Sequence, residues 1–194
     1  MEDPNRCRHL CIDMQRLFAE DTAWHVPWME KIREPIATLS CAHPAETIFT
    51  RFVPPLRPSD ATGTWREYYL KWPMMTREVL GDDMVDLLPE FRELVPPATV
   101  FDKAVYSPWM DGRLHRHLQE QDVTTLVISG GETDVCVLGA VTGAVDLGYS
   151  ILLLKDAICS ASDETHDATL GIYASRFSTQ IQVSSVPEVL DWWS

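Results

Sequence analysis

The feature that most constrains the fold is a regular alternation of short apolar runs with longer stretches of helical periodicity. Runs rich in β-branched and apolar residues, typical of buried strands, occupy 9–13, 46–52, 99–106, 124–129, 150–154 and 179–184. Helical patterns lie between them at 28–41, 114–121, 133–147 and 163–175. Strands that alternate with helices form βαβ units. The sequence therefore predicts a doubly wound α/β fold, with a mostly parallel sheet of about six strands and helices on both faces.

A chain of 194 residues is long enough to bury a sizeable core, so we expect 1–194 to form a single domain. The one irregular stretch, at about 54–97, resembles an insertion and combines seven prolines with many aromatic and charged residues. Long loops in compact domains usually serve a function. Two roles stay open for it: a lid or wall over a binding site, and a contact between subunits of a homo-oligomer.

The charge balance narrows the class of partner. A net charge of −13 repels phosphate backbones and anionic lipids, so we expect neither nucleic acid nor membrane as a partner. No apolar run reaches the roughly 18 residues of a membrane span, and the amino terminus lacks the apolar core of a signal peptide. Five cysteines without a CxxC pair indicate reduced thiols in the cytoplasm. The expected partner is a small molecule.

Three polar residues fall where strands should end: Asp13, Lys103 and Cys136. The stretch 129–136 (SGGETDVC) indicates a strand, a glycine turn at Gly130 and Gly131, and the first turn of a helix. Free N–H groups at a helix start lower the pKa of a thiol and can receive the oxyanion of a carbonyl under attack. Because active sites of α/β folds gather at the carboxyl ends of the strands, we expect these side chains to meet there.

Each of these residues also has a purely structural interpretation. Cys136 could be a small core residue of an apolar helix, Asp13 a helix cap and Lys103 a surface residue. Cys7, His9 and Cys11 share one face of the first strand, but three ligands on one strand are too crowded for tetrahedral metal binding. The coincidence of three reactive side chains at one sheet edge favours catalysis.

The motifs in their order resemble those of the isochorismatase-like cysteine hydrolases. The segments that carry the resemblance are 10–15 (LCIDMQ), 101–107 (FDKAVYS), 129–137 (SGGETDVCV), 155–157 (KDA) and 162–166 (SDETH). They extend over about the whole chain in the order and spacing of the family. Each motif is weak alone, and the ordered set is specific.

The resemblance implies a mechanism. Cys136 would be the nucleophile, Asp13 its base and Lys103 the cation that holds both, with a thioester as intermediate. The N–H groups of Glu132 and Cys136 would form the oxyanion hole, and the Gly131–Glu132 peptide bond would be cis. The activity implied is hydrolysis of a small amide, ureide or carbamoyl C–N bond, by an enzyme with no cofactor.

Departures from the family pattern narrow this expectation. Nicotinamidases of the family bind a metal through an Asp-x-His pair after the second strand, where this chain has 50–54 (TRFVP), so no metal is expected. Isochorismatases that cleave a vinyl ether lack the cysteine that this chain retains. Two alternatives stay open: a nicotinamidase-like amidase without metal, and a non-catalytic binding or assembly module with this fold.

Residues that could bind the substrate are mostly aromatic. Arg51 could anchor a carboxylate or carbonyl through its planar donor fork, because it lies near the end of the second strand. Tyr106 could cover the site from the lysine strand. The remaining candidates for the pocket wall are Trp24, His25, Trp65, Tyr69, Trp72 and Trp109.

Overall fold

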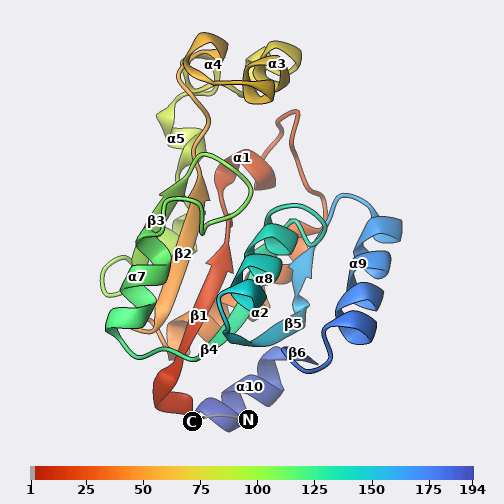
Figure 1. Ribbon diagram of the computed structural model, residues 1–194. Helices are drawn as coiled ribbons and strands as arrows, with labels where there is room; N and C mark the ends of the chain where they lie inside the picture. The colour runs from red at the N-terminus through yellow and green to blue at the C-terminus, as the bar shows by residue number, and fades with distance from the viewer. Residues whose placement is uncertain (1–2) are drawn as a thin grey trace.

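Six parallel strands form the centre of the part that the computed structural model describes, residues 3–194 (Figure 1). Their order across the sheet is β3-β2-β1-β4-β5-β6. This confirms the predicted α/β fold. The strands are β1 (Cys7–Ile12), β2 (Thr47–Phe52), β3 (Thr99–Lys103), β4 (Thr125–Gly131), β5 (Ser150–Cys159) and β6 (Ile181–Ser184).

The order in which the chain adds strands to the sheet reverses at the boundary between β1 and β4. β1, β2 and β3 are added successively toward one edge, whereas β4, β5 and β6 are added toward the other. β1 and β4 pair in register from Cys7 opposite Thr125 to Ile12 opposite Gly130. In open α/β sheets a crevice forms at the carboxyl ends of the strands where the order reverses. That point lies directly beyond Ile12 and Gly130.

Helices cover both faces, and each strand divides its side chains between two cores. α2 (Met29–Ala42) and α10 (Val186–Trp193) pack on the face that includes Cys11 and Phe49. α7 (Arg113–Glu120), α8 (Cys136–Asp146) and α9 (Asp163–Arg176) pack on the face that includes Leu10 and Ile48 (Figure 1). Within residues 3–194, no helix is both long and apolar enough to span a bilayer.

Several boundaries differ from the expected ones. α2 continues through Pro35. Because proline has no N–H, the helix lacks the usual hydrogen bond to the carbonyl of Lys31, a residue on the exposed side of the helix. β3 ends at Lys103, and β5 extends to Cys159 instead of ending at 154. α8 begins at Cys136, three residues later than the apolar pattern indicated.

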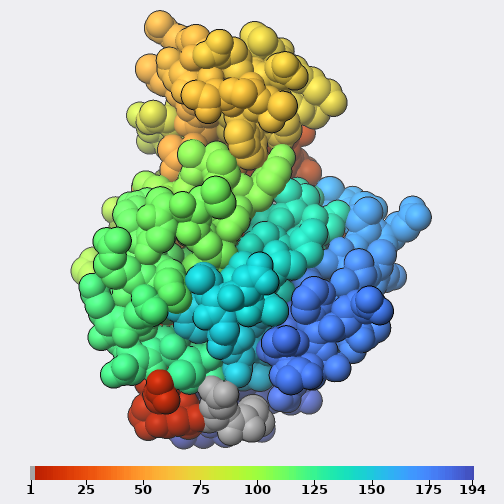
Figure 2. All heavy atoms as spheres, in the orientation of Figure 1, coloured from red at the N-terminus to blue at the C-terminus, as the bar shows by residue number. Residues whose placement is uncertain are grey.

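Residues 54–97, which we call the arm, are more regular than expected. Their prolines and glycines separate short helices and do not produce an irregular loop. Residues 64–80 of the arm stand above the carboxyl ends of the strands, with a narrowing beneath them (Figures 1 and 2). The later part of the arm returns to the body of the molecule, where Leu88 and Phe91 pack in the same core cluster as α2. Its helices are η2 (Pro58–Asp60), α3 (Thr64–Lys71), η3 (Pro73–Met75), α4 (Arg77–Leu80), α5 (Asp82–Val85) and α6 (Pro89–Arg92).

Gln15 joins the end of β1 to β2 and to the arm. Its side-chain amide donates to the carbonyls of Phe52, at 3.0 Å, and Val85, at 2.5 Å. Its carbonyl oxygen accepts from the N–H of Phe52 at 2.7 Å. Gln15 is fully buried, so these bonds are shielded from water. It leads into α1 (Arg16–Ala19), the short helix beneath the arm.

Candidate active site

Asp13 follows β1 directly and has a left-handed backbone with a φ of +52°. Residues other than glycine seldom adopt this conformation, which persists where the surroundings fix it. Here Thr50 on β2 fixes both ends of the residue. Its hydroxyl donates to Asp13 Oδ1 at 2.6 Å and accepts from the Asp13 N–H at 3.2 Å. The carboxylate is fully buried and aimed at the end of the sheet.

Lys103 is the last residue of β3, and its ammonium group has three acceptors for its three protons. Nζ lies 2.6 Å from Asp13 Oδ2, 3.3 Å from the Val105 carbonyl and 3.5 Å from Cys136 Sγ. Burial acts to lower the pKa of Lys103, but the charges of Asp13 and Cys136 raise it by more, so the net shift is upward. The lysine therefore stays charged, and links β3 to the start of α8.

Cys136 is the first residue of α8, and its side chain lies beside Asp13 and Lys103. The turn that leads to it contains a cis peptide bond between Gly131 and Glu132, the geometry that the family resemblance implies. Among residues 3–194, the N–H groups of Glu132 and Cys136 have no hydrogen-bond acceptor, whereas that of Val137 donates to the Glu132 carbonyl. Two unpaired donors next to the thiol could receive a developing oxyanion.

Gly130 is required by the close approach of β4 to β1. Its φ is +107°, and a Cβ placed on it would lie 2.0 Å from the carbonyl oxygen of Ile12. A side chain here would separate the two strand ends that carry Asp13 and the turn before Cys136. The glycine therefore lets the Asp13 carboxylate and the Cys136 thiol come together at the reversal point of the sheet.

The pKa of the Cys136 thiol is raised, which corrects the expectation that the helix start lowers it. Burial raises it most, because only 5% of the residue is exposed. The negative charge of the Asp13 carboxylate raises the thiol pKa further, and the positive charge of Lys103 lowers it without reversing the net upward shift. The resting group is thus a thiol, not a preformed thiolate. Nucleophilic attack from it requires a base to take its proton.

A cavity of about 300 Å³ opens onto Cys136 between the arm and the loop before α2. Of the aromatic candidates, Trp24, Trp72 and Tyr106 line it. Tyr68 also lines it, although it was not among the expected residues. The remaining lining residues are Phe18, Ala23, His25, Val26, Phe52, Glu132, Val135 and Ala161.

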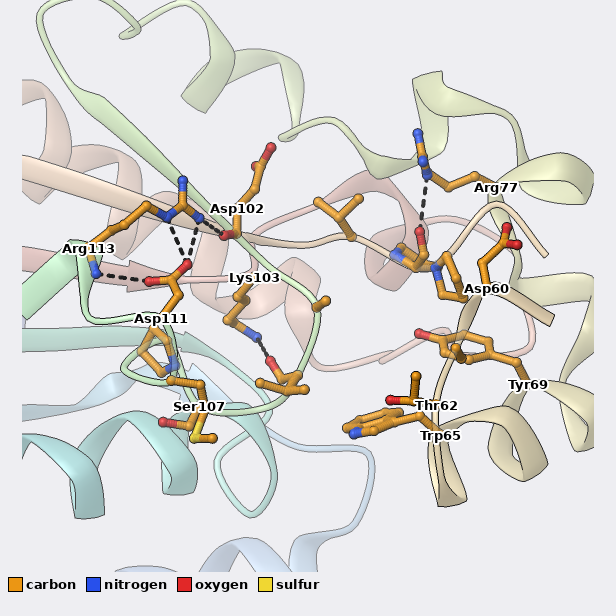
Figure 3. A pocket seen from close by; sticks show the side chains of 18 residues that line it. Asp60, Thr62, Trp65, Tyr69, Arg77, Asp102, Lys103, Ser107, Asp111 and Arg113 are labelled. Atoms are coloured by element: carbon orange, nitrogen blue, oxygen red, sulfur yellow. Dashed lines mark hydrogen bonds and ion pairs between the residues drawn. The ribbon is translucent and has the colours of Figure 1, made fainter. Parts of the chain in front are cut away.

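A larger cavity of about 630 Å³ lies on the other side of Lys103 (Figure 3). Trp65 and Tyr69 form its wall on the arm, opposite Lys103 and Ser107. Cys136 is not among the residues that line it. Trp65 packs against Tyr106 with 4.9 Å between ring centroids, so this pair lies between the two cavities. The smaller cavity is the candidate site, because it contains the thiol.

Four expected binding residues lie outside the candidate cavity: Trp65 and Tyr69 line the larger one, and Arg51 and Trp109 line neither. Arg51 does not line the cavity at Cys136, which corrects the expectation that it anchors a substrate. Its guanidinium is held by Asp102, at 2.8 and 3.0 Å, and by Asp86, at 2.9 Å. Trp109 is also outside the cavity. It packs onto α8 at Gly143 and donates from Nε1 to the Ala140 carbonyl at 2.8 Å.

The donor set around Cys136 does not fit a metal ion. No group of three His, Cys, Asp or Glu side chains within residues 3–194 is arranged to hold one. Thr50 occupies the strand next to the base and bonds with Asp13. His9 has its ring nitrogens against the hydroxyls of Ser129, at 2.7 Å, and Thr47, at 3.3 Å. Thr50 and His9 are thus engaged with neighbouring side chains.

Comparison with solved structures supports the fold. A cysteine hydrolase from Pseudomonas syringae pv. phaseolicola 1448A is 25% identical with a TM-score of 0.83, and the match covers 99% of this chain and 94% of that chain. An N-carbamoylsarcosine amidase from Thermoplasma acidophilum is 18% identical with a TM-score of 0.75, covering 93% of this chain and 96% of that one. At this lower identity the likeness concerns the fold alone.

Comparison of sequences identifies the family. An uncharacterized isochorismatase family protein, PncA, from Bacillus subtilis (strain 168) is 30% identical over 97 residues, which is 49% of this chain and 53% of that protein. The chain thus spans about half the length of the curated relatives that it matches. The sequence model of the isochorismatase domain matches residues 7–185. The protein with this buried Asp–Lys–Cys cluster belongs to the isochorismatase family of hydrolases.

Proposed function

We propose that this protein is a cysteine-dependent hydrolase that cleaves the C–N bond of a small amide, ureide or carbamoyl compound through a thioester. One observation carries the proposal. At the carboxyl end of the sheet, Lys103 contacts both Asp13 and Cys136, which come from separate parts of the chain, and Cys136 lines a cavity with room for a small molecule. Relatives of known structure include a cysteine hydrolase and an amidase of an N-carbamoyl compound.

In the acylation step, Asp13 takes the proton of the Cys136 thiol while the sulfur attacks the carbonyl carbon. A C–S bond forms and the carbonyl π pair moves to oxygen, where the N–H groups of Glu132 and Cys136 receive the charge. The oxyanion then collapses and the C–N bond breaks. Asp13 returns its proton to the leaving nitrogen, which departs as ammonia or an amine. Lys103 remains protonated and stabilises the carboxylate before and after each transfer.

In the deacylation step, water replaces the departed amine. Asp13 takes a proton from the water, whose oxygen attacks the thioester carbon and forms a second tetrahedral oxyanion. The C–S bond breaks, and the proton returns from Asp13 to the sulfur. The products are a carboxylic acid, or a carbamic acid when the substrate is a ureide, and the restored thiol. Each step thus uses one proton carrier whose position Thr50 and Lys103 fix.

A combined screen tests this proposal. Small primary amides, ureas and ureido compounds are assayed for ammonia release with the wild type and with Cys136→Ala. Cys41→Ala is the matched control, since Cys41 is exposed and lies on α2. Turnover of one class by wild type and Cys41→Ala, with at least a thousandfold loss in folded Cys136→Ala, supports the proposal. Residual activity within tenfold in Cys136→Ala would refute the assignment of the nucleophile.

The same screen separates the alternatives. Preference for nicotinamide would favour the metal-independent nicotinamidase, and this must be checked because the cavity is lined by aromatic rings. A non-catalytic module would release no ammonia from any class and would form no covalent adduct on Cys136 in intact-mass spectra with a slow substrate. The contact between Asp13 and Lys103 argues against a decayed site, because a buried ion pair without a role is costly to keep.

We further propose that residues 1–194 act as one domain, in the cytoplasm, and assemble into a homo-oligomer. The cysteines within residues 3–194 are all unpaired, which supports a reducing compartment. The arm exposes apolar side chains that another copy could cover, including Leu70 and Val79. Light scattering coupled to gel filtration tests the assembly. A monomer at all concentrations would contradict it.

A further inference from the structure

The cavity at Cys136 combines aromatic walls with a single carboxylate. Rings of Trp24, Tyr68, Trp72 and Tyr106 line it, as do those of Phe18 and Phe52. Trp24 contacts several of the others, with ring centroids 5.7 to 6.3 Å apart. Aromatic faces carry negative potential and attract cations, most strongly where water is excluded. The walls therefore suit an organic cation as well as an apolar group.

Glu132 supplies the charge. It lines the cavity, and its Oε2 accepts a hydrogen bond from the Ala161 N–H at 3.0 Å. Cys136 lines the same cavity, so the carboxylate and the thiol border one space. Burial raises the pKa of Glu132, because the ionised carboxylate has no cation beside it. A positively charged ligand would remove that penalty.

No fixed cation balances this charge. The described residues that line the cavity include no lysine and no arginine. Lys103 is committed to Asp13, Val105 and Cys136, and Arg51 is committed to Asp86 and Asp102. A substrate carboxylate would therefore enter a cavity whose described lining residues include one carboxylate and neither a lysine nor an arginine to pair with it. The net charge of −13 adds a long-range field that attracts cations to the molecule.

We propose that the substrate is a small amide whose non-reacting end carries an alkylated ammonium group, held by the aromatic walls and Glu132 while its carbonyl lies at Cys136. This inference rests on the proposed function and narrows its substrate class. It disfavours ureido acids, whose carboxylate the cavity does not accommodate. The amide carbonyl would face the free N–H groups, and the ammonium end would lie toward Glu132.

Binding to Cys136→Ala tests the inference without turnover. Isothermal titration calorimetry at pH 8, above the usual titration range of histidine, compares three amides. They are 2-(trimethylammonio)acetamide, its neutral isostere 3,3-dimethylbutanamide, and anionic malonamate. We expect the cationic amide to bind at least about tenfold more tightly than the neutral one. Malonamate should bind most weakly. Equal or weaker binding of the cationic amide would overturn the proposal.

Variants locate the origin of the preference. In the Cys136→Ala background, Glu132→Gln should reduce the ratio of cationic to neutral affinity to within about twofold. Glu164→Gln, which removes an equal charge from the exposed start of α9, should leave the ratio unchanged. Trp72→Leu is a second test of the cavity if Glu132→Gln does not fold, and it should also lower the ratio. A preference that survives both cavity variants would refute the role of the cavity.

Turnover by the unmodified enzyme separates this inference from the proposed function. Selective binding of the cationic amide without ammonia release from any amide would sustain the inference about the cavity and defeat the assignment as a hydrolase. Ammonia release without preference for the cationic amide would sustain the hydrolase and defeat the inference.

Discussion

Replacing Asp13 with asparagine should remove the proton acceptor while preserving its shape. The carboxylate is fully buried and accepts bonds of 2.6 Å from Lys103 and from Thr50. An asparagine amide can accept one of these bonds but cannot take a proton from the thiol. Because the pKa of Cys136 is raised, almost no thiolate forms without a base. General-base catalysis contributes about 10²–10⁴-fold, so kcat should fall by that factor, equal to a barrier increase of about 3–5 kcal/mol.

The same variant should also lower the free energy of unfolding. Lys103 would lose its counter-charge at a position with 8% exposure, and breaking a buried ion pair costs about 3–5 kcal/mol unless the lysine loses its proton. Initial rates of ammonia release and urea unfolding measure the two effects. The control is Asp102→Asn, whose exposed pair with Arg51 should be worth no more than about 1 kcal/mol. A kcat loss below tenfold in Asp13→Asn, or an equal loss in the control, would refute the reasoning.

Three other properties follow from the structure. Gly130→Ala should lower the free energy of unfolding by about 3 kcal/mol or more, because its Cβ would meet the Ile12 carbonyl at a positive φ. Gly171→Ala on α9 should raise it by up to about 1 kcal/mol. Chemical denaturation measures both, and equal effects would contradict the close approach of β4 to β1. Burial lowers the pKa of His9 to about 3, so below about pH 6.5 the unfolded chain binds a proton that the folded chain does not. Stability should therefore fall by about 2 kcal/mol from pH 7.5 to pH 5, and less in His9→Gln. Enzyme stripped with a chelator should retain full activity, and recovery only on adding zinc, iron or manganese would revive a metal-dependent nicotinamidase.

The positions that the sequence predicts well are those that the backbone determines. Asp13 and Lys103 end strands, and a parallel sheet brings its strand ends to one edge whatever the side chains do. The glycine pair before Glu132 likewise reports on backbone geometry. For these residues, periodicity and turn chemistry are sufficient.

The sequence pattern does not predict which side chains from distant parts of the chain bind to one another. Arg51 lies near a strand end as expected, but Asp86 from the arm and Asp102 from β3 take its donors. Tyr68 was recoverable, because it follows Trp65 by three residues, a spacing that places the two rings on one side of α3. The prolines around that helix masked the signal. The pKa of the Cys136 thiol depends mainly on burial, and a helix-start motif in the sequence does not predict how deeply the thiol is buried.

Under the proposed function, the arm would supply recognition to a site whose chemistry comes from elsewhere in the chain. Asp13, Lys103 and Cys136 are fixed by the sheet and α8, whereas Tyr68 and Trp72 approach from a separate stretch of chain. Substitutions in that stretch can therefore reshape what the enzyme accepts while the reacting groups keep their spacing. Gln15 marks the boundary, since it holds Val85 of the arm two residues beyond the base. Exchange of the arm between relatives, with this glutamine retained, is thus a route to new substrate ranges on an unchanged catalytic base.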